Sequence, residues 1–241
     1  MNNNFRATAD LPFPLDFSVI DFETATIEMS SACSIGIACV KNNAIIGEFY
    51  SLVKPTPLSV SAKNFEIHGI SVDDLRDAPG FQEVWADVQN IIQNSKYIIA
   101  HNAQFDMSVL HETSKASHFE IDNFQYIDSI NLCSCYSNGA GNGLDTIARY
   151  FEVDNDHHHN ALNDAITAAN CVIKAVEQSK YKSFLDLVSK DNNVKIKQFK
   201  DLKSNKLFGG FRKFNSINVN DITATTSQFD DSTFLANSKL T

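Results

Sequence analysis

The sequence predicts an α/β fold with a mixed β-sheet. Two observations carry this prediction. Residues 34–40 and 44–50 are strand-like apolar segments separated by only three residues, which is typical of a β-hairpin. The chain then alternates short apolar segments with longer amphipathic ones up to about residue 178. Such alternation predicts crossover connections and parallel strands, so the sheet combines both strand directions.

The expected strands come from short apolar runs. Residues 17–22 form the first of these runs, and the hairpin strands follow it. Asn42 and Asn43 suit the hairpin turn because asparagine tolerates the positive φ that tight turns require. Residues 97–100 and 126–128 are two further short strands.

The expected helices show apolar residues three and four positions apart. The clearest begins after Gly80 and is marked by Phe81, Val84, Trp85, Val88, Ile91 and Ile92. A second begins near Gln104. Residues 143–151 and 161–176 fit two more helices, and residues 181–188 fit a short one.

The composition suits a globular protein with one sizeable core. The chain has 241 residues, of which 43% are hydrophobic, and no run approaches the roughly 20 apolar residues that span a bilayer. The first residues lack the basic and then apolar pattern of a signal peptide. Five cysteines lie in apolar segments, an odd number that favours reduced, buried thiols. We therefore expect a cytoplasmic protein with no membrane partner.

The charge is distributed unevenly along the chain. Residues 1–189 carry 11 basic and 24 acidic side chains, a net of −13, whereas residues 190–213 carry 8 and 2, a net of +6. We expect residues 1–16 to be a loose lead-in, 17–178 the functional domain, 179–213 a basic helical or linker segment, and 214–241 a disordered tail. The overall charge of −9 disfavours nucleic acid unless bound cations offset it.

Three acidic clusters, far apart in sequence, are candidates for a metal site. Asp21 and Glu23 are two residues apart in an expected strand, so both side chains lie on one face. Asp106 is expected at the start of a helix, where the helix dipole favours an acid. Asp164 belongs to an alanine-rich helix, and His159 precedes it by five residues. Each acid alone is more simply a solvated strand end or an ordinary helix first turn.

Together, the four carboxylates and one histidine indicate metal-dependent chemistry. Oxygen ligands select hard cations such as Mg²⁺ or Mn²⁺ rather than zinc. Two such ions about 4 Å apart can stabilise the attacking water and the leaving oxygen of a phosphodiester. An imidazole with a pKa near neutrality can take the proton from that water.

The chain resembles the DEDDh (DnaQ-like) family of 3′–5′ exonucleases, which includes the proofreading epsilon subunit of bacterial replicative DNA polymerase. The family's first motif is matched by residues 19–24, its second by residues 101–106, and its third, H-x-A-x-x-D-A, by residues 159–165. Residues 67–71 resemble the family's I/V-H-G-I segment. The resemblance covers about residues 16–178. It implies a ribonuclease-H-like fold, with a five-stranded mixed β-sheet and helices on both faces.

The resemblance also implies roles for individual residues. Asp21, Glu23, Asp106 and Asp164 are implied to hold two Mg²⁺ or Mn²⁺ ions, and His159 to act as general base. Nucleotide binding is implied at Phe22, Thr24, Ala25, Ile67, His68, His101 and Asn102. His159 is preferred over His157 and His158 only by its spacing to Asp164. The implied activity removes nucleoside 5′-monophosphates from the 3′ ends of nucleic acid, with DNA favoured.

Two alternatives remain open at the level of the sequence. Instead of a DNA exonuclease, the chain could be an exoribonuclease that trims RNA ends. It could also be a polymerase-associated or scaffold subunit whose residues 180–241 dock a polymerase or repair partner. The role of the basic segment 190–213 is open as well. It either grips a nucleic-acid backbone or forms a solvated linker or docking peptide.

Overall fold

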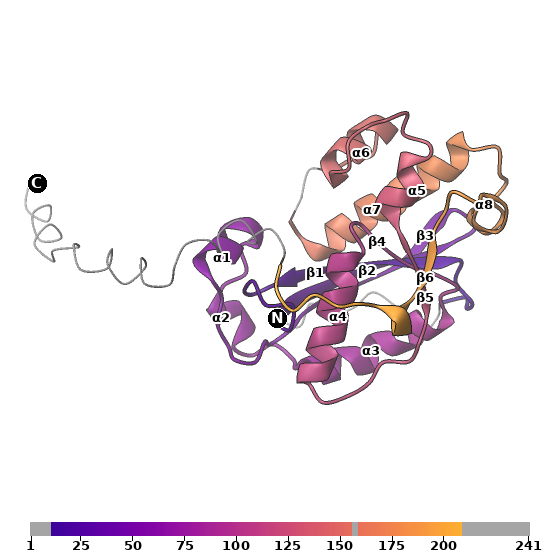
Figure 1. The fold of residues 1–241 in the computed structure, drawn as a ribbon. Coiled ribbons are helices and arrows are strands. Elements are labelled where there is room, and N and C mark those ends of the chain that lie inside the picture. The colour runs from indigo at the N-terminus through magenta and orange to yellow at the C-terminus, as the bar shows by residue number, and fades with distance from the viewer. Residues whose placement is uncertain (1–10, 156–158, 209–241) are drawn as a thin grey trace, which may run out of the picture. The chain divides into compact units, whose positions relative to one another are not determined.

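The computed structural model describes residues 11–155 and 159–208, and residues 156–158 lie outside this part together with both ends of the chain. Within it, six strands form one sheet in the order β3-β2-β1-β4-β5-β6 (Figure 1). β1 pairs in parallel with β4, and β4 with β5, whereas the β1–β2, β2–β3 and β5–β6 pairs are antiparallel. The strands are β1 (Phe17–Thr24), β2 (Ala32–Lys41), β3 (Ala44–Leu52), β4 (Ile98–Ala100), β5 (Gln125–Asp128) and β6 (Ile196–Gln198).

The predicted hairpin is formed by β2 and β3. Asn42 and Asn43 both have positive φ, 53° and 58°, which is the conformation of the two-residue turn that matches the twist of a hairpin. At the other end of β2 the pairing with β1 shifts register between Glu23 and Thr24. Such an irregularity changes the direction of the strand at the point where the candidate site begins.

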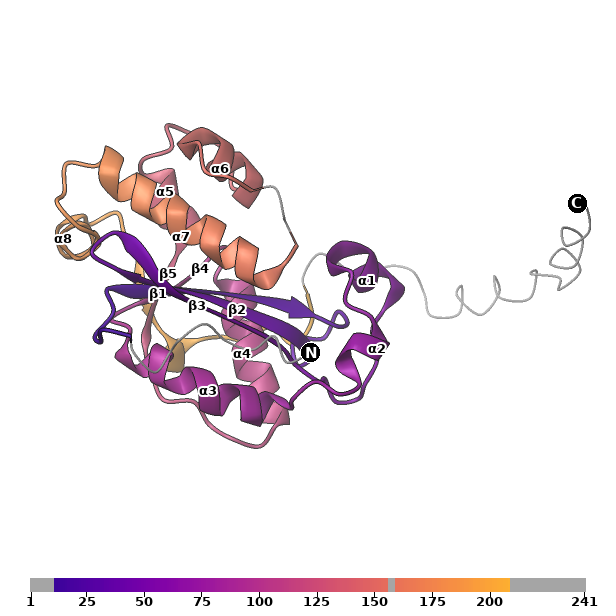
Figure 2. The same ribbon diagram turned by 180° about the vertical axis from the view of Figure 1, so that it is seen from behind.

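Helices cover both faces of the sheet (Figures 1 and 2). α3 (Phe81–Asn94) and α4 (Gln104–Ala116) pack against one face and share a core with Ile20 and Phe22. α5 (Ser129–Ser134), α6 (Leu144–Phe151), α7 (Ala161–Gln178) and α8 (Phe184–Lys190) cover the other face, whose core includes Phe17 and Val19. Alternate residues of β1 thus enter opposite cores, as the twofold period of a strand requires.

Two short helices follow β3 and lie beside the end of β1 (Figures 1 and 2). α1 (Ala62–His68) begins at Ser61, whose side chain accepts a hydrogen bond from the backbone N–H of Asn64, and ends at Gly69 with φ 72°. α2 (Val72–Leu75) begins with a capping box formed by Ser71 and Asp74. Neither helix was predicted, because segments of seven and four residues show too little periodicity.

The predicted α/β fold with a mixed sheet is confirmed, but the expected five strands are corrected to six. The additional strand, β6, comes from the basic segment that was expected to be helical or a linker. Ile196 pairs with Ile127 of β5, and the turn of 3₁₀ helix η1 (Phe199–Asp201) follows. The strand was missed because it has only three residues. A single apolar residue, Ile196, between two lysines shows no periodic pattern.

Two smaller expectations also differ from the structure. Leu11 and Leu15 are buried in the core, so the described part of the lead-in packs against the domain. Four cysteines are buried as expected, but Cys135 is exposed. Among the described residues no helix combines the length and apolarity needed to cross a bilayer.

Candidate active site

β1 places two carboxylates side by side at its end. Asp21 and Glu23 lie on the face of the sheet that Phe17 and Val19 share with α7. Their partners across the strand pair are Gly36 and Ser34 of β2. The prediction that both acids lie on one face is therefore confirmed.

Gly36 allows α7 to approach this pair of acids. A Cβ at this position would lie 2.2 Å from the carbonyl carbon of Ala161 and 2.2 Å from the backbone nitrogen of Leu162. The first turn of α7 thus rests directly on the backbone of β2, opposite Asp21. Sequence reasoning missed this role, although a glycine inside a strand is a known sign of close backbone approach.

The first turn of α7 supplies the third carboxylate. Asn160 caps the helix by accepting a hydrogen bond from the backbone N–H of Asn163, and Asp164 is 5% exposed. His159 precedes the cap in the left-handed region, with φ 69°. Its backbone N–H donates to Oδ2 of Asp164 at 3.1 Å. This bond folds the chain back so that the histidine and the aspartate face the same space.

α4 supplies the fourth carboxylate from the opposite side. Asp106 lies in the first turn of α4 and is 1% exposed. Its Oδ1 accepts a hydrogen bond of 3.0 Å from the backbone N–H of Phe22, which lies between Asp21 and Glu23 in β1. Its other oxygen, Oδ2, is buried and has no hydrogen-bond partner among the described residues.

Burial and mutual repulsion make these acids hard to ionise by themselves. Burial raises the pKa of Asp21 well above its usual value, and the charges of Asp106, Glu23 and Asp164 raise it further. Burial and the charge of Asp164 raise the pKa of Glu23 to about 8. Burial also raises the pKa of Asp106, against the hydrogen bond from Phe22. A divalent cation in their midst would reverse this effect.

The arrangement fits hard cations. Ligand atoms of Glu23, His159 and Asp164 lie within 4.8 Å of one another. The unpartnered Oδ2 of Asp106 is a buried acceptor of the kind that a metal ion or its bound water satisfies. Carboxylate oxygens dominate the set, which favours Mg²⁺ or Mn²⁺ over softer metals.

The helix α1 holds the end of β1 beside the acids. The carbonyl oxygen of Thr24 accepts hydrogen bonds from Nδ2 of Asn64 at 2.7 Å and from His68 Nε2 at 3.2 Å. Nδ1 of His68 accepts from the backbone N–H of Ile70 at 3.0 Å, so the ring proton is on Nε2. Burial lowers the pKa of His68, and the neighbouring His159 lowers it further. The ring is therefore neutral and lies close to His159.

The sequence of the chain matches a model of a known protein family. A family model described as an exonuclease of the RNase T type matches residues 18–172, more than half of the chain. The chain belongs to this exonuclease family. The expected membership of the DEDDh, DnaQ-like group is thereby confirmed, and the three motifs that suggested it are those that meet at the end of β1.

Curated relatives of this exonuclease domain include a bacterial DNA polymerase and a DNA polymerase subunit. DNA polymerase III PolC-type of Caldanaerobacter subterraneus subsp. tengcongensis is 29% identical over 191 residues, which cover 78% of this chain and 13% of that protein. The epsilon subunit of DNA polymerase III of Buchnera aphidicola subsp. Schizaphis graminum is 31% identical over 61% of this chain and 69% of the relative. The chain thus spans about one eighth of the PolC-type relative.

Solved structures share the fold of this exonuclease domain. The nuclease domain of 3′hExo, a DEDDh family member bound to rAMP, superposes with a TM-score of 0.61 at 16% identity and covers 78% of this chain and 98% of that one. Exonuclease X in complex with 5′ overhanging duplex DNA gives 0.59 at 22% identity, over 72% and 98% of the two chains.

The predicted nucleotide-binding residues lie around the same end of the exonuclease sheet. The side chains of Phe22 and Ala25 are buried, so only their backbone can face a ligand, whereas Ile67 is 44% exposed on α1. His101 bonds to the hydroxyl of Ser129 at 2.9 Å and to the carbonyl of Asn142 at 2.8 Å. These two bonds tie β4 to α5 and to the loop before α6.

Two further residues brace this end of the exonuclease domain and were not predicted. Asn64 holds Thr24 from α1. Asp128 caps α5 and accepts a hydrogen bond of 3.2 Å from the backbone N–H of Asn102, which has φ 61°. No sequence signal distinguishes either residue from an ordinary surface polar residue. The prediction that His157 and His158 are bystanders falls on residues outside the described part.

Proposed function

We propose that this exonuclease domain is a metal-dependent 3′–5′ exonuclease that releases nucleoside 5′-monophosphates from nucleic-acid ends. The observation that carries the proposal is the convergence of Asp21, Glu23, Asp106 and Asp164 with His159 at one end of β1. The acids come from three separate elements, and without a cation their burial and mutual repulsion are unfavourable. We take Mg²⁺ or Mn²⁺, two per site, as the cofactors.

Each of these residues would have a distinct role in the reaction. The four carboxylates would hold the metal ions, which when bound lower the pKa of water and stabilise negative charge on the phosphate. His159 is exposed, and a ring nitrogen lies near the carboxylates of Glu23 and Asp164, so one of its nitrogens would accept the proton of the attacking water. The neutral ring of His68 would keep Thr24 in place beside the terminal nucleotide.

Substitution of His159 tests the base separately from the metal site. His159→Ala is expected to lower turnover of a 3′-labelled oligonucleotide in Mn²⁺ by about 10² to 10⁴-fold, the range typical of a general base. Stabilisation of the protein by Mn²⁺ should persist. Exposed His118→Ala is the matched control. An unchanged rate removes His159 from the base role, and a wild-type protein that leaves oligonucleotides intact in Mn²⁺ rejects the exonuclease activity.

The substrate is proposed to be DNA, a choice supported by the replicative polymerase names of the curated relatives. Parallel time courses on matched DNA and RNA oligonucleotides test this choice. A higher kcat/KM on RNA would favour the exoribonuclease alternative. A polymerase or repair partner bound through residues 180–241, and a cytoplasmic location, stay predictions.

A further inference from the structure

A row of evenly spaced lysines runs along the segment that follows α8. Lysine recurs at every third residue from position 197 to position 206, and one more precedes β6. Residues 195–206 contain five lysines and one acid, Asp201, so their formal charge is +5 − 1 = +4. All five side chains are exposed. This lysine row consists of Lys195, Lys197, Lys200, Lys203 and Lys206.

The lysine row leads from the outer edge of the sheet to the candidate active site. Lys197 pairs with Tyr126 in the β5–β6 ladder. Nε2 of Gln104, two residues before the ligand Asp106, donates to the carbonyl of Lys203 at 2.9 Å. The carbonyl of Lys206 accepts a hydrogen bond of 2.9 Å from the backbone N–H of Met29, in the loop that joins β1 to β2. In Figures 1 and 2 this orange segment crosses α4 and reaches the arrowhead of β1.

Among the residues that the structure describes, the ammonium groups of the lysine row form no ion pair with a carboxylate. Lys197 lies over the ring of Tyr126, with its Nζ 5.8 Å from the centroid. A row of like charges repels itself, and a polyanion that spans it removes this repulsion and releases counterions.

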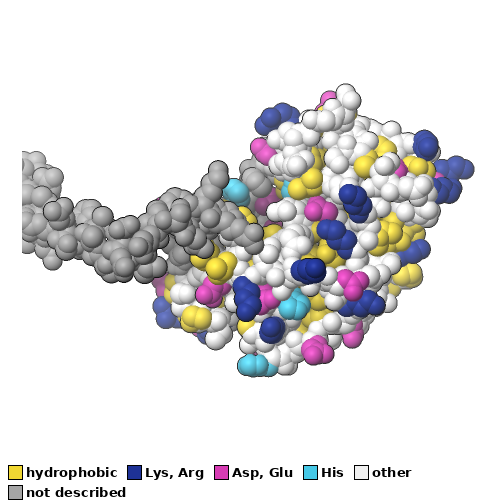
Figure 3. Space-filling model, viewed as in Figure 1, with side chains coloured by type: hydrophobic (Ala, Val, Ile, Leu, Met, Phe, Trp, Pro, Cys, Tyr) yellow, Lys and Arg dark blue, Asp and Glu magenta, His cyan; other side chains and the backbone are white. Residues whose placement is uncertain are grey.

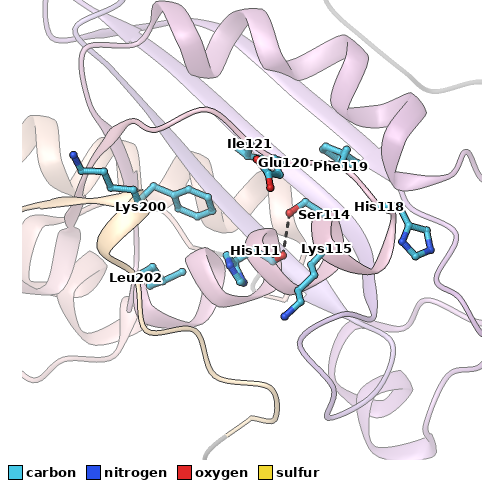
Figure 4. A pocket seen from close by; sticks show the side chains of 10 residues that line it. His111, Ser114, Lys115, His118, Phe119, Glu120, Ile121, Lys200 and Leu202 are labelled. Carbon is cyan, nitrogen blue, oxygen red and sulfur yellow. Dashed lines mark hydrogen bonds between the residues drawn. The ribbon is translucent and has the colours of Figure 1, made fainter.

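A cavity beside the lysine row extends the basic surface. It has a volume of about 620 Å³ and lies between the C-terminal half of α4, the loop after it and residues 199–202. Figure 4 shows Lys115 and His118 on the side of α4 and Lys200 on the opposite side. Glu120 also lines the cavity. Figure 3 shows Lys and Arg side chains spread over this face of the molecule.

We propose that the lysine row is a track for the phosphodiester backbone of the strand whose 3′ end occupies the active site, an inference that rests on the proposed exonuclease function. Three residues of extended chain span at most about 10 Å, so each flexible lysine can reach a different phosphate. Single-stranded nucleic acid is bound in this way by basic surfaces that follow its backbone. The row ends beside the site that receives the 3′ end, which favours a strand over an acidic protein surface.

The salt dependence of binding tests the track without requiring catalysis. The row variant carries Lys197→Gln, Lys200→Gln, Lys203→Gln and Lys206→Gln, and the control carries four such changes at Lys96, Lys174, Lys180 and Lys182. Binding of a fluorescent 20-mer of single-stranded DNA is measured in chelator at several salt concentrations. Each lost phosphate contact lowers the slope of log K against log salt by about 0.7, so we expect a decrease of about 3 in the row variant and of less than about 1 in the control.

Two further measurements test whether the charges of the lysine row and of the DNA backbone account for binding: arginine variants of the protein, and DNA with uncharged linkages. Replacing the same four lysines by arginine keeps the charge and should restore the slope, which would attribute the loss in the glutamine variant to the missing charge. Methylphosphonate linkages upstream of the 3′ end should weaken binding by the wild type at least tenfold and by the row variant less than threefold. Equal losses in both proteins would overturn the track.

Hydrolysis of a dinucleotide separates the two proposals. The ratio of kcat/KM on the 20-mer to kcat/KM on the dinucleotide should fall at least tenfold in the row variant and stay constant in the control. If the wild type hydrolyses neither substrate but the slopes differ as expected, the exonuclease proposal fails and the track stands. If the row variant and the control have the same slope, the proposal of a track is wrong. A lysine row that binds an acidic protein instead would give this result.

Discussion

The two oxygens of Asp106 have different surroundings. Oδ1 receives the backbone N–H of Phe22 and thereby fixes β1 relative to α4. Oδ2 is buried without a hydrogen-bond partner among the described residues. One carboxylate thus combines a structural bond with a free acceptor, which keeps the free oxygen in a defined position. An asparagine could make the first contact but would bring no negative charge to the second.

Neutralising Asp21 is expected to uncouple stability from metal binding. Burial and three neighbouring acids make its charge unfavourable in the metal-free protein. Asp21→Asn should therefore leave the metal-free protein at least as stable as the wild type. With Mn²⁺ at 100 times the dissociation constant, the wild type should gain about 2.7 kcal/mol and the variant less than about 1 kcal/mol.

Chemical denaturation with and without Mn²⁺ measures both quantities. Asp87→Asn, on the exposed side of α3, is the matched control and should keep the full metal effect. A full gain in the Asp21→Asn variant would contradict its role as a ligand.

At the scale of elements, the contact between α7 and β2 decides where Asp164 lies. Gly36→Ala places a methyl group 2.2 Å from the backbone of Ala161, which neither element can accommodate without moving. Overpacking of this kind typically costs about 1–3 kcal/mol. A shift of about 1 Å in catalytic groups lowers rates by about 10²-fold. We therefore expect loss of both stability and activity.

A second glycine provides the control for this substitution. At Gly80 an added Cβ would meet only Oε2 of Glu83, at an ordinary 3.6 Å. Gly80→Ala should change the free energy of unfolding by less than about 1 kcal/mol and leave kcat unchanged. If Gly36→Ala behaved like Gly80→Ala in unfolding and kinetic measurements, the close approach would not position the site.

The helix α1 should act on substrate binding rather than on the metal. Asn64→Ala removes one of the two hydrogen bonds that hold the carbonyl of Thr24, at a cost of about 1 kcal/mol. We expect KM for a 3′ end to rise about five- to tenfold, with a smaller change in kcat. Steady-state kinetics checks this split, with exposed Glu66→Ala of the same helix as control. An unaltered KM would show that the hydrogen bond from Asn64 to the carbonyl of Thr24 has a purely structural role.

At the scale of the whole molecule, the segment after β6 joins elements that are far apart in sequence. The hydroxyl of Ser204 donates to Oε1 of Glu112, and the backbone N–H of Asn205 donates to the hydroxyl of Ser108 at 3.0 Å. Together with the contact of Met29 to Lys206, these bonds connect the edge of the sheet, α4 and the loop after β1. The segment is therefore an integral part of the fold.

The bond between Ser204 and Glu112 predicts a dependence of stability on pH. Burial raises the pKa of Glu112, but hydrogen bonds from Ser204 and His111 outweigh this effect, so the pKa lies below its usual value. A lowered pKa means that the carboxylate stabilises the fold above about pH 4.5 and that this contribution is lost as the pH falls. Glu112→Gln should cost about 1 kcal/mol at pH 7.

Urea unfolding across pH checks this prediction. The wild type and Glu112→Gln should converge as the pH falls through the lowered pKa of Glu112, because the carboxyl group is then protonated in both the folded and the unfolded state. Glu66→Gln, at an exposed position, is the matched control variant. A constant difference between wild type and Glu112→Gln at all pH values would show that the charge of Glu112 contributes nothing.

The sequence alone determined the type of fold and the motifs of the candidate site. Strands such as β1 and helices such as α3 were evident because their apolar residues follow the twofold or 3.6-residue period of regular structure. Asp21 and Glu23 could be assigned to one face for the same reason. The order and spacing of the three motifs sufficed to indicate the family that the comparisons confirm.

The tertiary structure alone decided which groups meet. The approach of α7 to Gly36, the clamp of Asn64 on Thr24 and the pairing of β6 with β5 all join residues distant along the chain. Such contacts depend on how whole faces pack, and packing leaves no periodic mark on the residues it brings together. The lysine row shows this most clearly. Its spacing is visible in the sequence, but only the fold brings its end to the loop that follows the acids of β1.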